Sequence, residues 1–416
     1  MRLVVQKYGG TSVGTSERIR KVAERIVETQ REGCRVVAVI SAMAGVTDNL
    51  LRLASEVSSD PTKRELDVLL ATGECAATAL VTMAINALGS RAISLTGAEA
   101  GILTDSAHTR ARIANISSKQ VQELLEDDYV VIVAGFQGQS GQGEITTLGR
   151  GGSDLSAIAL AGALNADACQ IFTDVDGVFT CDPKIVQNAE KLDEVAYDEL
   201  LEMAGAGSKV MQSRAVEFAK KFGVQFEVRS SLNRNLGTMA REESASMEDV
   251  VIRGISVDRN QAKVTVDDVR DAPGIAGRIF STIARGNIVV DMIVQSVSEH
   301  GTTDVSFTIH EADLDAARKL LEPLLKEVSA AGLITKSGVA KLSVVGIGMR
   351  SHSGVAARLF DCLGKGDINI QLISTSEIKI AVVVDEKDVE RAAQLAHAEF
   401  GLARLAPTTA VSRAFS

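Results

Sequence analysis

Two glycine-rich stretches of the sequence combine a charged side chain with an expected helix start, an arrangement that can bind phosphate or carboxylate groups. The first is the run KYGGTS at residues 7–12, where an apolar strand ends and a helix is expected to follow. It places backbone N–H groups and a helix N-terminus beside the ammonium of Lys7. It is not a Walker A loop, because the chain has no G-x-x-x-x-G-K-[ST] sequence. A turn of this kind on its own could equally be structural.

The second stretch is TTLGRGGSD at residues 146–154, which again leads into a helical pattern. Its three glycines let the backbone approach a ligand closely. Arg150 offers a planar fork to a carboxylate or phosphate, and Asp154 could hold an ammonium group or a metal-bound water. A simple helix cap would need neither the arginine nor a second glycine, so we interpret this stretch as part of a binding site.

A third stretch, FTDVDGVFTCDP at residues 172–183, follows an apolar strand and contains Asp174 and Asp176. These residues resemble the start of an EF-hand calcium loop, but Gly177 stands at the fourth position, whereas that loop needs glycine at the sixth. We therefore reject a calcium loop and expect a nucleotide-facing loop at the carboxyl end of the strand.

Weaker candidates follow other strands or glycines. Lys209, in GSKV at residues 207–210, is expected at a helix start, although lysines in such places are usually only solvated. Ser41, Thr47 and Glu74 could each be helix caps or polar residues at the edge of a core.

The first half of the chain alternates short apolar runs with longer amphipathic ones, which predicts a mostly parallel sheet covered by helices. The expected strands are Leu3–Gln6, Arg35–Ile40, Tyr129–Ala134, Cys169–Thr173 and Gln225–Val228. The polar stretch from Asn233 to Glu248 shows no periodicity, so we expect a linker there.

An internal repeat occupies the last third of the chain. The run GIAGRIF at residues 274–280 is echoed by GVAARLF at 354–360, an offset of 80 residues, and residues 288–293 and 368–373 keep this offset. AKVTV at 262–266 is echoed by AKLSV at 340–344. Each copy has the order strand, helix, strand, strand, helix, which predicts two small split βαβ units. Shared patterning without common architecture is the alternative.

Composition limits the classes of partner and compartment. The chain of 416 residues is long enough for two or three domains, and its net charge of -10 disfavours nucleic acid and anionic membranes as partners. The five cysteines include no C-x-x-C pair, so we expect free thiols in a reducing cytoplasm and no zinc site. No run approaches the ~20 apolar residues of a membrane span.

Taken in order, KYGGTS, SAMAGVTD, TGE, TTLGRGGSD, FTDVDGVFTCDP and GSKV resemble the signature of bacterial monofunctional aspartate kinases in the amino-acid kinase family. The repeat resembles the tandem ACT domains of that family. The resemblance implies an α/β fold: an αβα sandwich with a mostly parallel central sheet, followed by two βαββαβ ferredoxin-like ACT domains. It places the catalytic domain at residues 1–245 and the ACT domains at 262–335 and 340–410.

The activity that the resemblance implies is transfer of the γ-phosphoryl of MgATP to the β-carboxylate of L-aspartate, giving 4-phospho-L-aspartate. This is the first step of lysine, threonine and methionine biosynthesis. A carboxylate with a pKa near ~3.9 is already ionised at neutral pH, so the reaction needs positioning and charge neutralisation but no general base.

The resemblance also implies roles for individual residues. The catalytic residues would be Lys7, Arg150 and Asp154. The aspartate-binding residues would be Ser41, Thr47, Glu74, Arg150, Gly151, Gly152, Ser153 and Asp154. The ATP-binding residues would be Lys7, Tyr8, Gly9, Gly10, Ser41, Thr173, Asp174, Phe179, Lys184, Lys209 and Val210. Phe179 and Lys184 depart from the tyrosine and arginine that are common there, which puts these nucleotide contacts in doubt. No protein metal site is expected.

Regulation and assembly follow from the same resemblance. Lysine, threonine or both are the expected inhibitors, bound at interfaces between ACT domains by Asp271, Gly274, Ile275, Ala276, Gln295, Val355, Asn369, Ile370 and Ser376. We expect a homodimer or larger assembly, with a small subunit made from an internal start at Met247 as a further possibility. The alternatives are a kinase of another small carboxylate and a catalytically inactive amino-acid sensor.

Overall fold

The computed structural model describes residues 1–205, 211–243, 251–297 and 301–403. The chain forms two compact units. The first comprises Met1–Val178 and Lys191–Ala204 with the described part of Lys209–Ser244, and the second comprises Phe179–Glu190 and the described part of Ala245–Ser416. The predicted division into three domains differs in assigning Phe179–Glu190 to the catalytic domain, and the domain boundaries stay predictions.

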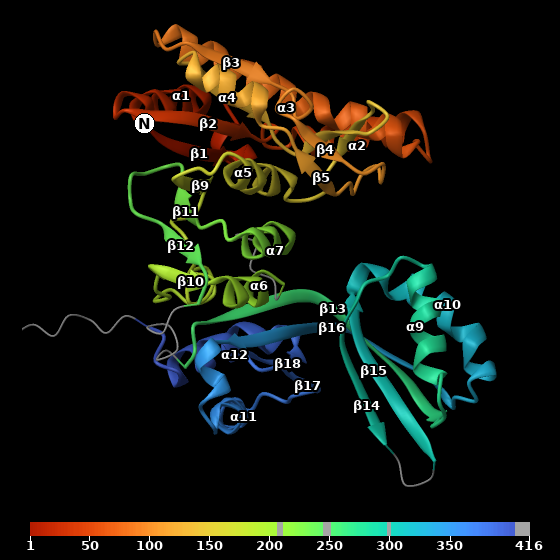
Figure 1. Ribbon diagram of the computed structural model, residues 1–416. Helices are drawn as coiled ribbons and strands as arrows, with labels where there is room; N and C mark the ends of the chain where they lie inside the picture. The colour runs from red at the N-terminus through yellow and green to blue at the C-terminus, as the bar shows by residue number, and fades with distance from the viewer. Residues whose placement is uncertain (206–210, 244–250, 298–300, 404–416) are drawn as a thin grey trace, which may run out of the picture. The chain divides into compact units, whose positions relative to one another are not determined.

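The first unit is built on an eight-stranded sheet with the order β10-β12-β11-β9-β1-β2-β6-β3 (Figure 1). Its strands are β1 (Arg2–Tyr8), β2 (Cys34–Ile40), β3 (Ala92–Leu95), β6 (Val130–Ala134), β9 (Ala168–Thr173), β10 (Glu194–Ala196), β11 (Phe226–Ser230) and β12 (Thr238–Arg241). All neighbouring strands are parallel except β11 and β12. The predicted mostly parallel sheet and its five expected strands are confirmed.

A smaller sheet of the same unit has the order β5-β4-β7-β8. Its strands are β4 (Ile102–Thr104), β5 (Ile113–Ile116), β7 (Gln137–Ser140) and β8 (Ile145–Thr147). The last strand leads directly into the TTLGRGGSD stretch, so this sheet carries the second glycine-rich loop.

Helices cover both faces of the main sheet. The helices of this unit are η1 (Gly10–Val13), α1 (Ser16–Arg31), α2 (Val46–Val57), α3 (Lys63–Ala87), α4 (Lys119–Glu126), α5 (Gly152–Ala163), α6 (Tyr197–Gly205) and α7 (Ser213–Phe222). Apolar residues of α1 and α3 form one core with Tyr8, Ile40 and Phe172. Helix α5 packs against β1, β2 and β9, on the opposite side from α1 in Figure 1.

Helix α3 is long and apolar enough to cross a membrane by length and composition, and it is the one such helix among the described residues. Half of its most apolar window is buried inside the protein, and the helix packs against α1, β3, β6 and β8. Because it also buries Asp67 and Glu74, we interpret it as a core helix.

The expected linker at residues 233–248 is wrong for its central part. Thr238–Arg241 form β12, which pairs parallel with β10 and antiparallel with β11. The strand has only four residues. Its buried positions are taken by Thr238 and Ala240, and because Thr238 is polar, the sequence lacks the alternation of apolar and polar residues that would predict a strand. The Thr238 hydroxyl donates to the Leu192 carbonyl at 2.6 Å and accepts from the Val178 amide at 2.9 Å.

The second unit contains both copies of the repeat. Its first copy comprises β13 (Gly254–Arg270), α9 (Ile275–Arg285), β14 (Val290–Val297), β15 (Thr302–His310), η2 (Glu311–Asp313) and α10 (Leu314–Glu327). The second comprises β16 (Gly332–Val345), η3 (Ile347–Arg350), α11 (Val355–Lys365), β17 (Leu372–Thr375), β18 (Lys379–Asp385), η4 (Glu386–Asp388) and α12 (Val389–Glu399). Helices α9 and α11 begin 80 residues apart, after Gly274 and Gly354 at φ 91° and 90°. The expected repeat is confirmed.

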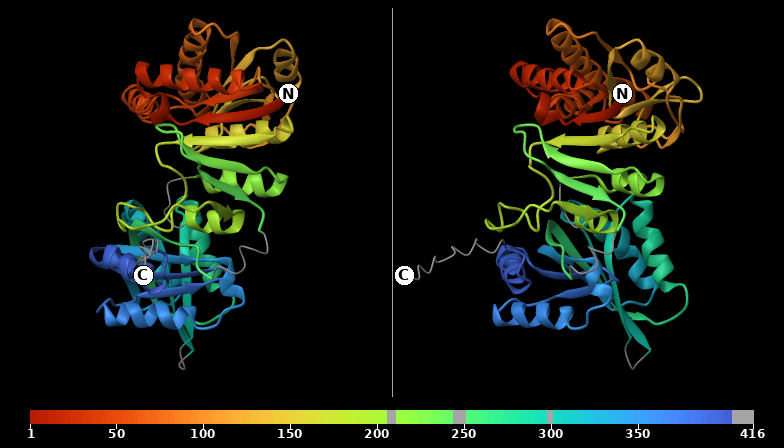
Figure 2. Two further views of the ribbon diagram at one scale, coloured as in Figure 1. Left: turned by 90° about the vertical axis from the view of Figure 1, so that its left-hand side faces the viewer. Right: turned by 60° about the vertical axis from the view of Figure 1, so that its left-hand side comes forward.

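The two copies form one antiparallel sheet, β14-β15-β13-β16-β18-β17 (Figures 1 and 2). Strand β13 serves both copies: Gly254–Asp258 pair with the second half of β16, and Gln261–Arg270 pair with β15. The order strand, helix, strand, strand, helix that was expected of each copy is confirmed. Among the described residues, however, the second copy has no fourth strand of its own after its last helix, and the start of β13 pairs with β16 in its place.

Each copy buries its helices against its own part of this sheet. Residues of α9 and α10 pack with Val264, Val266 and Phe307 in one core. Residues of α11 and α12 pack with Leu342, Val344 and Val382 in another, which also includes Cys181 and Val186. The segment that continues from the FTDVDG loop is therefore part of the core of the second copy.

Candidate active site

The parallel register brings several predicted site segments to one edge of the main sheet. Tyr8 at the end of β1 is level with Ile40 at the end of β2 and with Phe172 near the end of β9. The segments that follow these three strands therefore emerge side by side. We call this edge, together with the first turn of α5, the catalytic edge.

Lys7 and Asp154 meet at this edge. The Lys7 Nζ lies 2.6 Å from Asp154 Oδ1, and the two side chains are only 12% and 11% exposed. Alternation along β1 explains the direction of Lys7, because Gln6 and Tyr8 point to the α1 face, where Gln6 donates to Thr29 and Tyr8 stacks on Phe172. A nearly buried ion pair adds little net stability, but it holds the Lys7 ammonium in a fixed place.

The two glycines after Lys7 form a tightly packed turn beside its ammonium. A Cβ at Gly9 would lie 3.4 Å from Lys7 Nζ, and a Cβ at Gly10 would lie 2.7 Å from the Ala42 carbonyl oxygen. The Gly9 amide donates to the Phe172 carbonyl at 3.2 Å, and the Ala44 amide donates to the Gly10 carbonyl at 3.1 Å. These bonds fix the turn against the segments that follow β9 and β2.

The loop that carries Arg150 has two glycines in the left-handed region, Gly149 at φ 77° and Gly151 at φ 70°. A Cβ at Gly151 would also lie 1.9 Å from Gln212 Cγ, so only glycine fits there. Arg150 itself is exposed, and its guanidinium has no ion pair with any residue that the structure describes. It is therefore available to bind a carboxylate.

Glu74 is buried in the middle of α3, with 4% of its surface exposed. Its Oε1 accepts from the Ala42 amide at 3.1 Å, and its Oε2 has no hydrogen-bond partner among the described residues. Burial raises the pKa of Glu74 to about 7, against a smaller lowering by the Ala42 bond. A cationic group placed at Oε2 would stabilise the ionised form, so Glu74 is suited to hold a substrate ammonium.

The other predicted residues of the catalytic edge lie as follows. Ser41 directly follows β2 and donates its amide to the Tyr8 carbonyl at 3.1 Å, and Thr47 lies in the first turn of α2. Ser153 lies in the first turn of α5, whose buried start is Gly152. Thr173 ends β9, and its hydroxyl donates to Asp174 at 3.2 Å.

Four of the predicted nucleotide-binding residues do not lie in the described part of the first unit, which forms this edge. Phe179 and Lys184 belong to the second compact unit, and Lys209 and Val210 lie outside the described residues. The side chain of Tyr8 is completely buried in the core, so a ligand could reach only its backbone. The nucleotide roles of these residues stay predictions.

Sequence reasoning missed Gly135 and Phe136, which follow β6 at the same edge. A Cβ at Gly135 would lie 2.8 Å from the Ser153 Cβ, and Phe136 adopts φ 68°, a strained value for a bulky residue. The Phe136 amide donates to the Ser156 hydroxyl at 3.2 Å. An apolar strand followed by glycine, the pattern already seen at Gly9, could have identified them.

Within the described ranges, no group of three or more His, Cys, Asp or Glu side chains could hold a metal ion. Mg²⁺ commonly binds through nucleotide phosphates and water with only one or two carboxylates. Asp154, in the first turn of α5, and Asp174, directly after β9, are carboxylates in segments of this edge.

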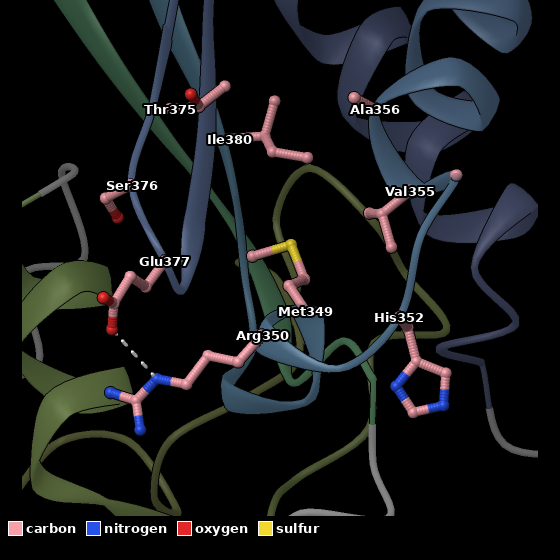
Figure 3. A pocket seen from close by; sticks show the side chains of 10 residues that line it. Met349, Arg350, His352, Val355, Ala356, Thr375, Ser376, Glu377 and Ile380 are labelled. Atoms are coloured by element: carbon pink, nitrogen blue, oxygen red, sulfur yellow. Dashed lines mark ion pairs between the residues drawn. The ribbon is translucent and has the colours of Figure 1, made fainter.

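The second ACT copy has a pocket of about 570 Å³ (Figure 3). Its lining includes Gly354, Val355, Ala356 and Thr375, which lie 80 residues after the predicted effector residues Gly274, Ile275, Ala276 and Gln295. Arg350 and Glu377 close one end of the pocket, with Nε and Oε2 3.4 Å apart. The counterpart of the acidic Asp271 is Ser351, so the two copies present different charges at equivalent loops.

Of the predicted effector residues, Val355 and Ser376 lie together in this pocket. Asn369 and Ile370 precede β17 and are not part of its lining. In the first copy, Asp271, Gly274, Ile275 and Ala276 form the loop and first turn of α9, and Gln295 is exposed on β14. Binding of an effector by these residues stays a prediction.

Comparison with known proteins gives matches over nearly the whole chain. The model of the amino acid kinase family matches residues 2–230, and that of the ACT domain matches residues 264–323 and 342–400. The chain is 50% identical over 405 residues to an aspartate kinase of Pseudomonas fluorescens (strain SBW25), covering 97% of this chain and 98% of that protein. It is 48% identical over 404 residues to an aspartokinase of Helicobacter pylori (strain ATCC 700392 / 26695), covering 96% and 99%.

Solved structures with the same fold include that of E. coli aspartokinase III in complex with aspartate and ADP, in the R-state. Its TM-score is 0.79 at 26% identity, and the match covers 96% of this chain and 99% of that one. The T-state of the same protein, in complex with lysine and aspartate, matches with a TM-score of 0.76 over the same shares of the two chains.

Proposed function

This chain belongs to the aspartate kinases of the amino acid kinase family and carries two ACT domains, and we propose that it transfers the γ-phosphoryl of MgATP to the β-carboxylate of L-aspartate. The observation that carries the proposal is the ion pair of Lys7 and Asp154 among the glycine turns of the catalytic edge. The product is 4-phospho-L-aspartate, the first intermediate towards lysine, threonine and methionine.

The residues of the catalytic edge supply what this reaction requires. The β-carboxylate of aspartate is ionised at neutral pH with a pKa near ~3.9, so no group has to remove a proton from the nucleophile. Catalysis then depends on positioning and on stabilising the charge of the transferring phosphoryl group. Lys7 supplies a fixed positive charge, and Gly9 and Gly10 let a phosphate approach the backbone beside it closely.

We assign substrate recognition to charged groups that have no partner, or an oxygen without a partner, among the described residues. Arg150 takes the α-carboxylate, because its guanidinium forks match two carboxylate oxygens and no described residue pairs with it. Glu74 takes the α-ammonium through the oxygen that lacks a partner among the described residues. Asp154 holds Lys7 in place and adds negative charge on the ammonium side of the substrate.

Mg²⁺ bound with the nucleotide would neutralise phosphate charge. Asp154 and Asp174 are the side chains of the catalytic edge whose oxygens suit this ion directly or through water. Binding of ATP is supported by the ADP in the structure of E. coli aspartokinase III.

Feedback inhibition by lysine, threonine or both accompanies this activity. The support is the lysine bound to the T-state of E. coli aspartokinase III and the pocket of the second ACT copy. There Glu377 and Arg350, at one end of the pocket, offer a carboxylate and a guanidinium to the α-ammonium and α-carboxylate of an amino acid. An effector that binds one global state tenfold better shifts the equilibrium by about 1.4 kcal/mol.

Assembly and location complete the proposal. The chain works in the cytoplasm, where its five cysteines, all described and all free, stay reduced. It forms a homodimer or larger assembly through the ACT sheets, and a small subunit starting at Met247, which lies outside the described residues, is a further candidate component. Light scattering of the purified protein with and without effector tests the assembly.

The central experiment measures ADP release from MgATP with L-aspartate, L-glutamate or no acceptor, each with lysine, threonine or both. Release that depends on aspartate and falls with either effector is the expected result. Release with glutamate in place of aspartate would move the substrate assignment within the fold. Release with no acceptor would contradict the kinase activity on amino acids.

A further inference from the structure

The carboxylate of Asp67 lies completely buried on α3 and accepts hydrogen bonds from two separate loops. His108 Nδ1 lies 2.8 Å from its Oδ2, and the Thr109 amide donates to both oxygens at 3.0 Å. The Thr147 hydroxyl donates to Oδ1. We call Asp67, His108, Thr109 and Thr147 the anchor cluster.

The anchor cluster is separate from the catalytic edge but lies on the same helix as Glu74. Seven residues separate Asp67 from Glu74, so the two carboxylates share one face of α3 about two turns apart. The bonds of Asp67 are all to the two loops, whereas Glu74 bonds to the segment after β2. Asp67 therefore has no described contact with the groups assigned to substrate.

The two loops that Asp67 holds are those that shape the Arg150 turn. Thr147 ends β8 three residues before Arg150. Thr109 adopts φ 69°, and its carbonyl oxygen lies 3.2 Å from the place of a Cβ on Gly149. The position of Gly149, next to Arg150, is therefore limited by the backbone that Asp67 fixes.

The guanidinium of Arg214 also holds these two segments, by hydrogen bonds to their backbone. Its Nη1 donates to the Leu148 carbonyl and its Nη2 to the Ala111 carbonyl, both at 2.6 Å. The Ala111 amide also donates to the Thr147 carbonyl at 2.9 Å. The segment from Thr147 to Gly149 is thus held on two sides, and Arg150 projects from a backbone with little freedom.

We propose that Asp67 is a positioning residue for phosphoryl transfer: by binding Thr109 and Thr147 it sets the place of the Arg150 guanidinium and so the capture of the substrate α-carboxylate. The inference rests on the proposed role of Arg150. A misplacement of about 1 Å in such a site can cost about 100-fold in rate. The residue acts on the use of aspartate and leaves ATP binding unchanged.

A double-mutant cycle of Asp67→Asn and Arg150→Ala tests the proposal, with kcat/KM for aspartate and KM for ATP read from ADP release. Asparagine keeps the shape but offers one acceptor oxygen where aspartate offers two. We expect Asp67→Asn to lower kcat/KM for aspartate by about tenfold or more, with KM for ATP within about twofold. If Asp67 acts through Arg150, the double variant loses no more than Arg150→Ala alone.

The outcomes separate the two proposals. Losses that multiply in the double variant, or an equal rise of KM for both substrates, would overturn the role of Asp67 while leaving that of Arg150. Unchanged activity of Arg150→Ala would overturn the assigned role of Arg150, whatever Asp67→Asn does.

Two further variants control for folding. Thr82→Val removes a buried hydroxyl of α3 that bonds only within its own helix, at 2.9 Å to the Thr78 carbonyl, and should keep activity. If Asp67→Asn does not fold, Thr147→Val replaces it in the cycle, because it removes one bond to the same carboxylate and leaves the carboxylate in place.

Discussion

Asp67 and Glu74, the two carboxylates on the buried face of α3, differ in the number of hydrogen bonds that they accept. Asp67 accepts bonds from a ring nitrogen, an amide and a hydroxyl, and both of its oxygens are used. Glu74 accepts one amide bond and keeps an oxygen without a described partner. The pKa of Glu74 is raised to about 7 by burial.

The hydrogen bonds of Asp67 hold two segments of the protein in place, whereas Glu74 has an oxygen to which a ligand could bind. A buried polar group without a partner destabilises the fold by about 1–3 kcal/mol, and a substrate cation at Glu74 Oε2 would offset that cost. Lys7 extends the comparison, because an ammonium has three donors and Asp154 is its one described ion-pair partner.

The largest expected effect is at Lys7. Lys7→Ala should lower turnover by about 1,000-fold or more, because the transferring phosphoryl group loses its fixed positive charge. Circular dichroism should show a folded chain. The matched control is Lys21→Ala, since Lys21 is 68% exposed and pairs only with Glu17 along α1. A folded and fully active Lys7→Ala protein would remove Lys7 from the mechanism.

Glu74→Gln should raise KM for aspartate by about tenfold or more, since a tenfold change corresponds to about 1.4 kcal/mol and the substrate ammonium loses a buried anionic partner. Binding of aspartate to the unmodified protein near pH 7 should also release protons, because the ammonium lowers the pKa of Glu74. Calorimetry in buffers of different ionisation enthalpy measures this release. Glu65→Gln, at a position on α3 that is 63% exposed, should behave like the unmodified protein; proton release that persists in Glu74→Gln would contradict the assignment.

Stability should depend on pH through the same group. The pKa of Glu74 is raised from 4.5 to about 7 in the folded state, so between these values the folded chain holds one more proton than the unfolded chain. The free energy of unfolding should therefore fall as pH rises through this window, by at most about 3 kcal/mol at 1.36 kcal/mol per pKa unit. The difference in thermal stability between the unmodified protein and Glu74→Gln measures it. Parallel pH profiles of the two proteins would show that Glu74 is ionised throughout.

The smallest effect on turnover is expected in the ACT copies. Asp271→Ala should leave uninhibited activity within about twofold but weaken inhibition by about tenfold or more, because the effector ammonium loses a carboxylate. Asp315→Ala, an exposed acidic residue at the start of α10, is the control. Dose–response curves with lysine and threonine measure the change, and unaltered inhibition would remove Asp271 from the effector site.

Much of the fold could be predicted from the sequence because the signals are local. Apolar runs gave the central strands, and Gly274 and Gly354 marked equivalent helix starts. The glycine-rich surroundings of Lys7 and Asp154 marked them as neighbours of a binding site, and the structure brings the two together; the role of Arg150 stays a prediction. Asp67 was missed, although it stands two helical turns before Glu74, because its partners His108 and Thr147 are distant in sequence and only the smaller sheet brings them together. The strand at Thr238 was missed because its burial depends on neighbours from elsewhere in the chain.

Strand β13 has a consequence for how the C-terminal half is made. Its first residues, Gly254–Asp258, complete the sheet of the second copy against residues 341–345 of β16, so they leave the ribosome more than 80 residues before their partners. The first copy can pair early, whereas the second must wait for a long loop to close, which slows folding. A fragment starting at Met247 would keep this strand whole, since β13 begins seven residues later at Gly254. A fragment starting at Ala262 would expose an unpaired edge of β16, and an exposed edge of this kind invites aggregation.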